Sequence, residues 1–188
     1  MVRALLCHHC AVINPTSAAC DVAPLSASDG SIIAEFVVLS MNWRGTEGWT
    51  IESVAADAHL RKYSNAWGLS SYDRGVVARS RQGTALGACW SRLFHPDDPG
   101  YGFVDSTTPE LGLAVVRGAR ARGIGGMLLD AHLSQLAQLA CAQVSLSVED
   151  GNESARALYT SRGFAVVGRH GNSDTMVRAL GSDDAVCL

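Results

Sequence analysis

The sequence predicts an α+β fold in which a mixed, mostly antiparallel sheet of about six to seven strands is flanked by about four helices. Short β-compatible runs separated by turn residues alternate with segments whose apolar residues recur at helical spacing. Residues 111–148 have the pattern of a strand, a glycine-rich turn, a helix and another strand. The length of 188 residues is enough for one domain with a substantial core.

In the N-terminal half, capping and turn residues separate the expected elements. Ser26–Asp29 precedes a run of apolar residues at helical spacing, and a glycine follows the second helical segment. In chain order we expect a strand at 19–25, a helix through residues 32–39, a loop at 42–50, a helix at 51–67, and a hairpin of strands 75–79 and 86–90.

The C-terminal half is more regular. A segment rich in Pro, Gly and Asp, residues 95–109, indicates a loop before the next strand. The leucines of residues 124–139 recur at the spacing of an amphipathic helix. The expected elements are a strand at 111–116, a helix at 124–139, a strand at 144–148, a helix at 152–161, and two closing strands at 164–167 and 175–180.

Composition and charge exclude several classes of protein. Hydrophobic residues make up 47% of the chain and charged residues 18%, as in ordinary globular proteins. A net charge of -3 argues against a general affinity for nucleic acid. No apolar run approaches the roughly 20 residues that span a bilayer, and residues 1–6 make a poor signal peptide. We therefore expect a cytoplasmic protein with neither nucleic acid nor membrane as a partner.

The six cysteines do not indicate a disulfide framework. Cys89 and Cys141 lie in apolar segments, where a free thiol behaves as a small hydrophobe. Cys7 and Cys10 flank two histidines, but a zinc site needs a second pair of ligands and only scattered cysteines are available. We expect no metal, a poorly ordered N-terminal extension over residues 1–18, and a single domain over residues 19–182.

The most informative segment is the turn Arg120–Gly126, where a strand leads into a helix. The first N–H groups of a helix have no partner within the helix, and its dipole places partial positive charge there. Glycines remove the Cβ atoms that would keep a phosphate from those N–H groups. The residues expected to hold the phosphates are Arg120, Arg122, Gly123, Ile124, Gly125 and Gly126, with Arg117 adding charge.

Spacing excludes two common phosphate loops. A P-loop counted from Gly118 needs Lys and Ser or Thr where the chain has Ile124 and Gly125. A Rossmann pattern counted from Gly123 needs a small residue at Leu128, and its turn follows the first strand of a parallel unit. The remaining alternative is a glycine-rich turn that only begins a helix, which three nearby arginines disfavour.

These residues resemble the GCN5-related N-acetyltransferase (GNAT) superfamily. Residues 120–125 match its signature of Gln or Arg, two variable residues, Gly, a variable residue, and Gly or Ala, and Val115 matches the valine that precedes this loop. Downstream, the segment Asn152–Phe164 matches the spacing Asn-x-x-Ala-x-x-Leu-Tyr-x-x-x-Gly-Phe. Arg117 departs from the proline of many members. The resemblance implies the GNAT fold, and it is sharpest between Glu110 and Phe164.

The resemblance implies acetyl-CoA as the donor and a primary amine as the acceptor, joined in a ternary complex. In this family the fourth and fifth strands splay apart, so that main-chain groups of Leu113, Ala114 and Val115 take the pantetheine arm. A backbone N–H there polarises the thioester carbonyl. Asn152 either contacts the cofactor arm or caps the helix that follows it, and both roles are compatible.

Two residues are candidates for proton transfer. Tyr159 matches the family's tyrosine, and its phenol has a pKa near enough to that of a thiol to protonate the leaving thiolate; the alternative is a core tyrosine. Glu110 precedes the fourth strand, where related enzymes have a Glu that acts directly or through water. It is the candidate base, with substrate orientation or a surface position as alternatives. Glu149 is the reserve candidate, and His95 and His132 are less attractive.

The acceptor site is expected between the first two helices and the loop at 95–105. Carboxylates and aromatic faces suit a cationic amine, so Trp43, Asp97, Tyr101 and Asp105 are the candidate substrate-binding residues. The leading hypothesis is an N-acetyltransferase. A catalytically silent acyl-CoA-binding regulatory module is the alternative, and a nucleotide- or nucleic-acid-binding module is disfavoured by the charge. A homodimer is compatible with the family.

Overall fold

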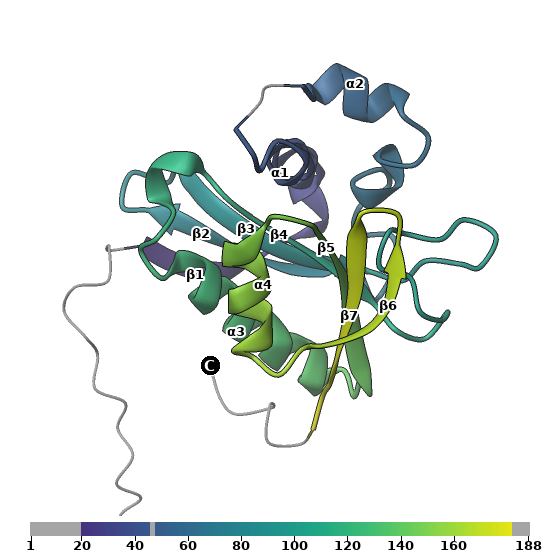
Figure 1. Ribbon diagram of the computed structural model, residues 1–188. Helices are drawn as coiled ribbons and strands as arrows, with labels where there is room; N and C mark the ends of the chain where they lie inside the picture. The colour runs from purple at the N-terminus through teal and green to yellow at the C-terminus, as the bar shows by residue number, and fades with distance from the viewer. Residues whose placement is uncertain (1–19, 46–47, 182–188) are drawn as a thin grey trace, which may run out of the picture.

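A seven-stranded sheet forms the centre of the computed structural model, which describes residues 20–45 and 48–181 (Figure 1). The strand order is β1-β2-β3-β4-β5-β7-β6, and every neighbouring pair is antiparallel except β4 with β5. The predicted mixed, mostly antiparallel sheet is confirmed. The strands are β1 (Cys20–Pro24), β2 (Arg74–Ser80), β3 (Ala85–Arg92), β4 (Glu110–Val115), β5 (Gln143–Glu149), β6 (Ala165–His170) and β7 (Ser173–Ala179).

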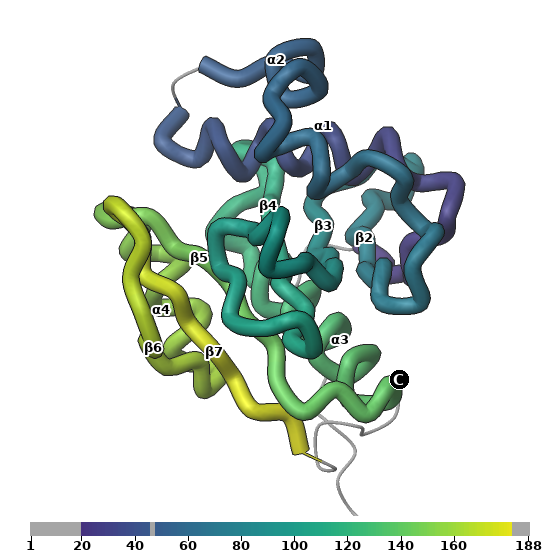
Figure 2. Tube along the Cα trace, turned by 90° about the vertical axis from the view of Figure 1, so that its right-hand side faces the viewer, coloured from purple at the N-terminus to yellow at the C-terminus, as the bar shows by residue number. Residues whose placement is uncertain are grey.

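Helices cover both faces of this sheet. The described residues contain four α-helices, namely α1 (Gly30–Met41), α2 (Ile51–Ala56), α3 (Ile124–Gln138) and α4 (Glu153–Thr160), with short 3-10 turns at Ala27–Asp29, Arg61–Tyr63 and Arg117–Ala119. Helix α1 packs on β3 and β4 from one side, whereas α3 packs on β2, β3 and β4 from the other. Figure 2 shows α1 and α2 together on one side of the strands and α3 on the opposite side.

The side chains of the sheet alternate between two cores, as expected for central strands covered on both sides. On β3, Ala88 and Trp90 join the core beneath α1, and Cys89 between them joins the core beneath α3. Cys89 and Cys141 are buried free thiols, which agrees with their reading as small hydrophobes.

The prediction of a single helix over residues 51–67 is wrong. Helix α2 ends at Ala56, and Asp57 then adopts an extended conformation. Its carboxylate accepts the backbone N–H groups of His59 and Leu60, at 2.8 and 2.9 Å. An aspartate that bonds to nearby amides competes with helical hydrogen bonding, and the chain continues as a turn and the 3-10 segment Arg61–Tyr63.

The strands β4 and β5 pair at only one register position. The pair Glu110 and Ser145 is the sole register pair between them, whereas β4 pairs with β3 along its whole length. Beyond Glu110, the edge of β4 that faces β5 therefore has no strand partner within the described residues. This divergence leaves main-chain groups on that edge of β4 available to a ligand, apart from the Val115 carbonyl, which accepts a hydrogen bond from Arg120.

The expected extension at residues 1–18 and its Cys7–Cys10 motif lie outside the described residues, as does the end of the predicted domain at residue 182. Among the residues that the structure describes, no helix is long and apolar enough to cross a membrane. In the same part of the chain, no group of three His, Cys, Asp or Glu side chains is placed to hold a metal ion.

Candidate active site

The glycine-rich turn begins α3 without a side-chain cap. Gly123 has φ +81° at the N-cap position, a left-handed conformation that favours glycine. The first helical hydrogen bond runs from the Met127 N–H to the Gly123 carbonyl. The amides of Ile124, Gly125 and Gly126 consequently lie at a helix start that no side chain caps, which is the geometry of an anion site.

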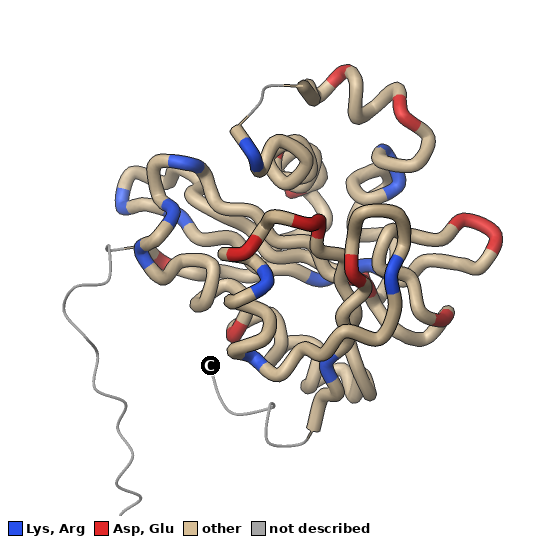
Figure 3. The backbone as a smooth tube through the Cα atoms, in the orientation of Figure 1, with Lys and Arg blue, Asp and Glu red and all other residues tan. Residues whose placement is uncertain are grey.

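The arginines of this turn differ in what they contact. Basic positions follow one another along the turn that leads into α3 (Figure 3). The Arg120 guanidinium donates to the carbonyls of Val115 and Trp43, both at 3.1 Å, so it ties the turn to β4 and to the segment after α1. Arg122 is exposed beside Gly123. The arrangement gives Arg120 a structural role in addition to its charge.

Asn152 precedes α4 and Tyr159 lies on it. Asn152 caps the helix, because its Oδ1 accepts the Ala155 N–H at 3.3 Å. Tyr159 is 6% exposed and packs against Phe164, with ring centroids 5.7 Å apart. Burial, with a smaller contribution from Cys89, raises the pKa of Tyr159, so the phenol holds its proton at neutral pH. The same core contains Leu113 and Leu158 at its edge.

Glu110 is a buried carboxylate at the point where β4 and β5 part. Glu110 is 4% exposed, and its Oε1 accepts a hydrogen bond of 2.8 Å from the Tyr63 hydroxyl. Oε2 is buried and has no hydrogen-bond partner among the described residues, and the same holds for Oγ of its register partner Ser145. Burial raises the pKa of Glu110 to about 7, against the opposing effects of Tyr63, the Gly102 backbone and Lys62.

Tyr63 is a site residue that the sequence did not indicate. Its hydroxyl donates to Glu110 and accepts the Tyr101 backbone N–H at 2.7 Å, so it links the carboxylate to the loop before β4. The ring packs edge-on against Phe94, with centroids 4.9 Å apart. Burial and the neighbouring Glu110 raise the pKa of Tyr63, which keeps its proton on the hydroxyl. No motif or spacing marks this residue, because its partners lie far along the chain.

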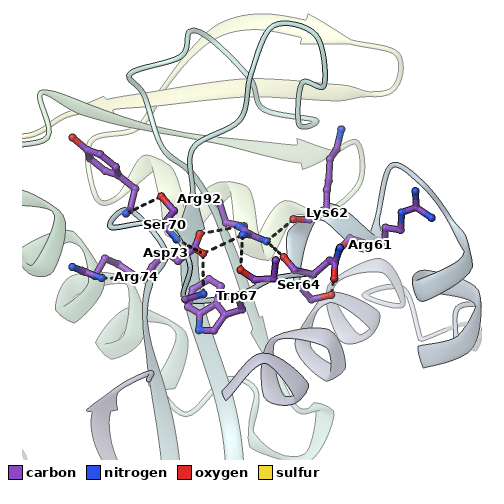
Figure 4. Close-up of polar contacts among 12 residues, drawn as sticks. Arg61, Lys62, Ser64, Trp67, Ser70, Asp73, Arg74 and Arg92 are labelled. Atoms are coloured by element: carbon purple, nitrogen blue, oxygen red, sulfur yellow. Dashed lines mark hydrogen bonds and ion pairs between the residues drawn. The ribbon is translucent and has the colours of Figure 1, made fainter. Parts of the chain in front are cut away.

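A buried ion pair fixes the segment that carries Tyr63 (Figure 4). Arg92, at the end of β3 and opposite Glu110 in register, donates to both oxygens of Asp73 at 2.9 and 3.0 Å. The same guanidinium donates to the carbonyls of Lys62 and Asn65, at 2.7 and 2.6 Å. A planar guanidinium can satisfy several acceptors at once, so Arg92 attaches the residues around Tyr63 to the sheet.

Glu149, the reserve candidate base, lies in a different environment. It accepts hydrogen bonds from Trp43 Nε1, Arg44 and Asn172, at 2.6, 2.6 and 2.7 Å. Burial acts to raise its pKa, but these three donors and the Arg44 charge outweigh burial and lower it. Glu149 thus stays ionised and fully engaged, which makes it a weak base.

The expected acceptor residues do not come together. The Asp97 side chain is 93% exposed, and Asp105 bonds to Thr107 and Thr108 of its own loop. Trp43 lies against Glu149. Tyr101 alone of the four lines a cavity of about 510 Å³. The other lining residues are His59, Pro99, Gly100, Phe103, Val104, Val167, Gly168, Arg169, His170 and Thr175.

The two histidines considered as bases lie elsewhere. His132 is fully buried on α3, where burial lowers its pKa to about 4, and Nδ1 lies 3.3 Å from the Gln135 amide oxygen. Its position in the helix agrees with a core side chain. His95 has a side chain that is 72% exposed. Neither histidine is among the described contacts of the Glu110 carboxylate.

Comparison with known proteins identifies the family. Residues 54–164 match the model of the acetyltransferase (GNAT) family, so the chain belongs to that family. It is similar to a mycothiol acetyltransferase from Acidimicrobium ferrooxidans, with 30% identity over 128 residues. That match covers 66% of this chain but 36% of the relative, so the chain spans about a third of the relative's length.

Solved structures share the fold. A GCN5-related N-acetyltransferase from Kribbella flavida superposes with a TM-score of 0.61 at 20% identity, covering 89% of this chain and 100% of that one. The PaiA N-acetyltransferase from Thermoplasma acidophilum, in complex with coenzyme A, gives 0.60 at 18% identity, with 86% and 99% covered. A GNAT-family acetyltransferase from Staphylococcus aureus gives 0.62 at 18%, with 87% and 100% covered. These similarities establish the GNAT fold that the sequence predicted.

Proposed function

We propose that this protein transfers an acetyl group from acetyl-CoA to a primary amine by direct attack within a ternary complex. The single observation that carries the proposal is Glu110, a buried carboxylate with a pKa of about 7, located where β4 and β5 diverge. A general base is most effective when its pKa lies near the working pH. The family's acetyl transfer and the uncapped start of α3 support the donor.

The donor would lie between β4 and β5. Its pyrophosphate would accept hydrogen bonds from the amides of Ile124–Gly126, with Arg122 at the same turn. The pantetheine arm would follow the main chain of Leu113–Val115, where β4 has no partner on its β5 side. A backbone N–H of that segment would polarise the thioester carbonyl. Asn152 keeps its cap role and stands at the start of the neighbouring helix.

The acceptor must lose a proton before or as it attacks. An ammonium has an ordinary pKa near 10, and the proton would pass to Glu110 through an intervening water, because that carboxylate is only 4% exposed. The amine nitrogen then bonds to the thioester carbon, and the carbon–sulfur bond breaks as the tetrahedral oxyanion collapses. The partnerless Glu110 Oε2 and Ser145 Oγ are the groups that such a water would bind.

Tyr159 is the proposed acid that protonates the leaving thiolate. Burial raises the pKa of its phenol, and the thiol of CoA would be affected in the same direction when it leaves water. The buried Cys89 thiol shows this effect in the same core, since burial raises its pKa as well. Because burial acts in the same direction on both groups, we propose that the phenol can still protonate the leaving thiolate.

Calorimetry with acetyl-CoA and desulfo-CoA tests the donor, and absence of binding at high micromolar concentration would refute it. A thiol-release assay over an amine panel then tests turnover. We expect Tyr159→Phe to lower kcat by about 100-fold with little change in acetyl-CoA affinity. Unchanged turnover in this variant would remove the acid role. Donor binding without turnover of any amine would instead show a catalytically silent acyl-CoA-binding module.

A further inference from the structure

The cavity beside Tyr101 lies near the proposed base. It is an open cavity lined by the segment 99–104, by residues of β6 and β7, and by His59 from the segment after α2. Gly100 forms part of its wall, and a Cβ on Gly100 would overlap Glu110 Oε2 and lie 2.8 Å from the Tyr63 hydroxyl. Gly100 thus lines the cavity and also lies next to the Glu110 carboxylate.

Apolar side chains that would ordinarily be covered are gathered around this cavity. Tyr101, Val104 and Val167 are 38%, 39% and 59% exposed, and all three line it. They come from two separate segments, and Pro99 and Phe103 add further apolar surface. Exposed apolar groups that converge on one concave site are typical of a surface that binds an apolar ligand.

The wall of the cavity offers no free carboxylate to a polycation. Asp57 and Asp98 act on the lining His59 from outside the wall, but Asp57 accepts two backbone amides and Asp98 pairs with Lys62. None of its lining residues is an aspartate or a glutamate. The lining cation Arg169 is held by Asp150 and Asp174, whose carboxylates are thereby engaged outside the lining. Burial and the Lys62 charge lower the pKa of His59, so its imidazole is neutral at pH 7. The carboxylates expected to recognise a cationic acceptor, Asp97 and Asp105, are not part of this wall.

We propose that this cavity binds the acceptor, and that the acceptor is a primary amine attached to an apolar body, aromatic or branched aliphatic. The proposal rests on the function proposed above. The apolar body packs against Tyr101, Val104 and Val167, and the amine points toward Gly100, which lies next to Glu110. Polyamines and aminoglycosides are excluded as preferred acceptors, because each carries additional ammonium groups for which the wall offers no carboxylate.

The experiment compares 2-phenylethylamine and 3-methylbutylamine with spermidine and an aminoglycoside, by thiol release at saturating acetyl-CoA. We expect kcat/KM for the two apolar amines to exceed that for the polycations by at least about tenfold. Binding of 2-phenylethylamine to the protein saturated with desulfo-CoA is measured separately by calorimetry, since this readout does not depend on turnover.

Adjacent residues of β6 offer a matched pair of variants. Val167 lines the cavity, whereas Val166 does not, although it is similarly exposed, at 52%. Val166 pairs across the strands with Met176, which belongs to the core beneath α3. We expect Val167→Asp to lower kcat/KM and affinity for 2-phenylethylamine by about tenfold or more. Val166→Asp should leave both unchanged, and acetyl-CoA affinity should be equal in both variants.

The outcomes separate the two proposals. Preferred turnover of spermidine or the aminoglycoside, or equal effects of the two valine variants, would overturn the apolar acceptor while acetyl transfer to amines stands. Absence of turnover with every amine, with acetyl-CoA still bound, would refute the proposed function; selective binding of 2-phenylethylamine that Val167→Asp abolishes would even then support an apolar cavity ligand.

Discussion

Two glutamates on neighbouring strands show how environment divides the work of chemically identical groups. Glu110 begins β4, is nearly inaccessible to water, and receives one side-chain hydrogen bond, from Tyr63. Glu149 ends β5 and receives three, from Trp43, Arg44 and Asn172. The pKa of Glu110 is raised to about 7, whereas that of Glu149 is lowered. Proton affinity follows the number of donors and the access of water, and it separates a base from a structural clamp.

The largest expected effect comes from removing the proposed base, Glu110. We expect Glu110→Gln to lower kcat by about 100- to 1,000-fold, because a positioned general base contributes about that much, while acetyl-CoA affinity changes little. The wild-type rate should rise with pH through about 7 as Glu110 ionises, and the variant should lose this dependence. Steady-state kinetics between pH 5.5 and 9 measure both.

Glu149→Gln is the matched control for that variant. It should retain the rise near pH 7 and lose less than tenfold in kcat, since Glu149 is already ionised there. If Glu149→Gln abolished the pH dependence and Glu110→Gln did not, the assignment of the two carboxylates would have to be reversed.

The two glutamates should contribute to the free energy of unfolding with opposite dependence on pH. Glu110 has a raised pKa in the folded protein, so its stabilising contribution is complete below about pH 4.5 and declines as pH rises through about 7. At about 1.4 kcal/mol per pKa unit, its ionisation costs about 3 kcal/mol of folding free energy well above pH 7. Glu110→Gln should therefore stabilise the protein at pH 9 and have little effect at pH 4.5.

The contribution of Glu149 has the opposite sign. Its lowered pKa gives stability that is present above its unfolded pKa and is lost as the solution is acidified. Because this side chain is partly exposed, Glu149→Gln should cost less than about 1 kcal/mol at pH 7. Urea unfolding at pH 4.5, 7 and 9 measures these changes, and a loss of stability in Glu110→Gln at pH 9 would contradict the comparison.

A smaller effect should follow from removing the Tyr63 hydroxyl, which donates a hydrogen bond to Glu110. Tyr63→Phe removes a hydrogen bond that lowers the Glu110 pKa, so the acidic limb of the rate profile should move to higher pH. At pH 6.5 we expect about a fivefold loss of kcat, from a hydrogen bond worth roughly 1 kcal/mol. Tyr72→Phe, a change at a partly buried tyrosine outside the site, is the control. A uniform loss at all pH values would mean that Tyr63 only supports the fold.

The sequence predicted the contiguous parts of the molecule well. The order of strands and helices followed from periodicity, and the start of α3 from its glycines, because these features depend on neighbouring residues. The helix at 51–67 was wrong because one side chain, Asp57, accepts two backbone amides in place of helical bonds. A propensity summed over many residues does not register such a local competition.

The acceptor side was less predictable for a physical reason. Asp97 and Asp105 were chosen for their charge, but one is exposed to water and the other bonds to its own loop. Tyr63 reaches Glu110 across 47 residues of sequence, and only the folding of the chain brings them together. Glu110 itself was a candidate, but its burial, which sets its pKa, is a property of the packed loop at Gly100–Gly102.

The single register pair between β4 and β5 has a mechanical consequence. In terms of strand pairing, β1–β4 and β5–β7–β6 are two sub-sheets joined at Glu110 and Ser145 alone. A rotation of one sub-sheet against the other would displace the far end of β5 most and the residues at this pivot least. If the strands part further to admit a ligand, the opening would be widest at the far end of β5, and Glu110 would move least.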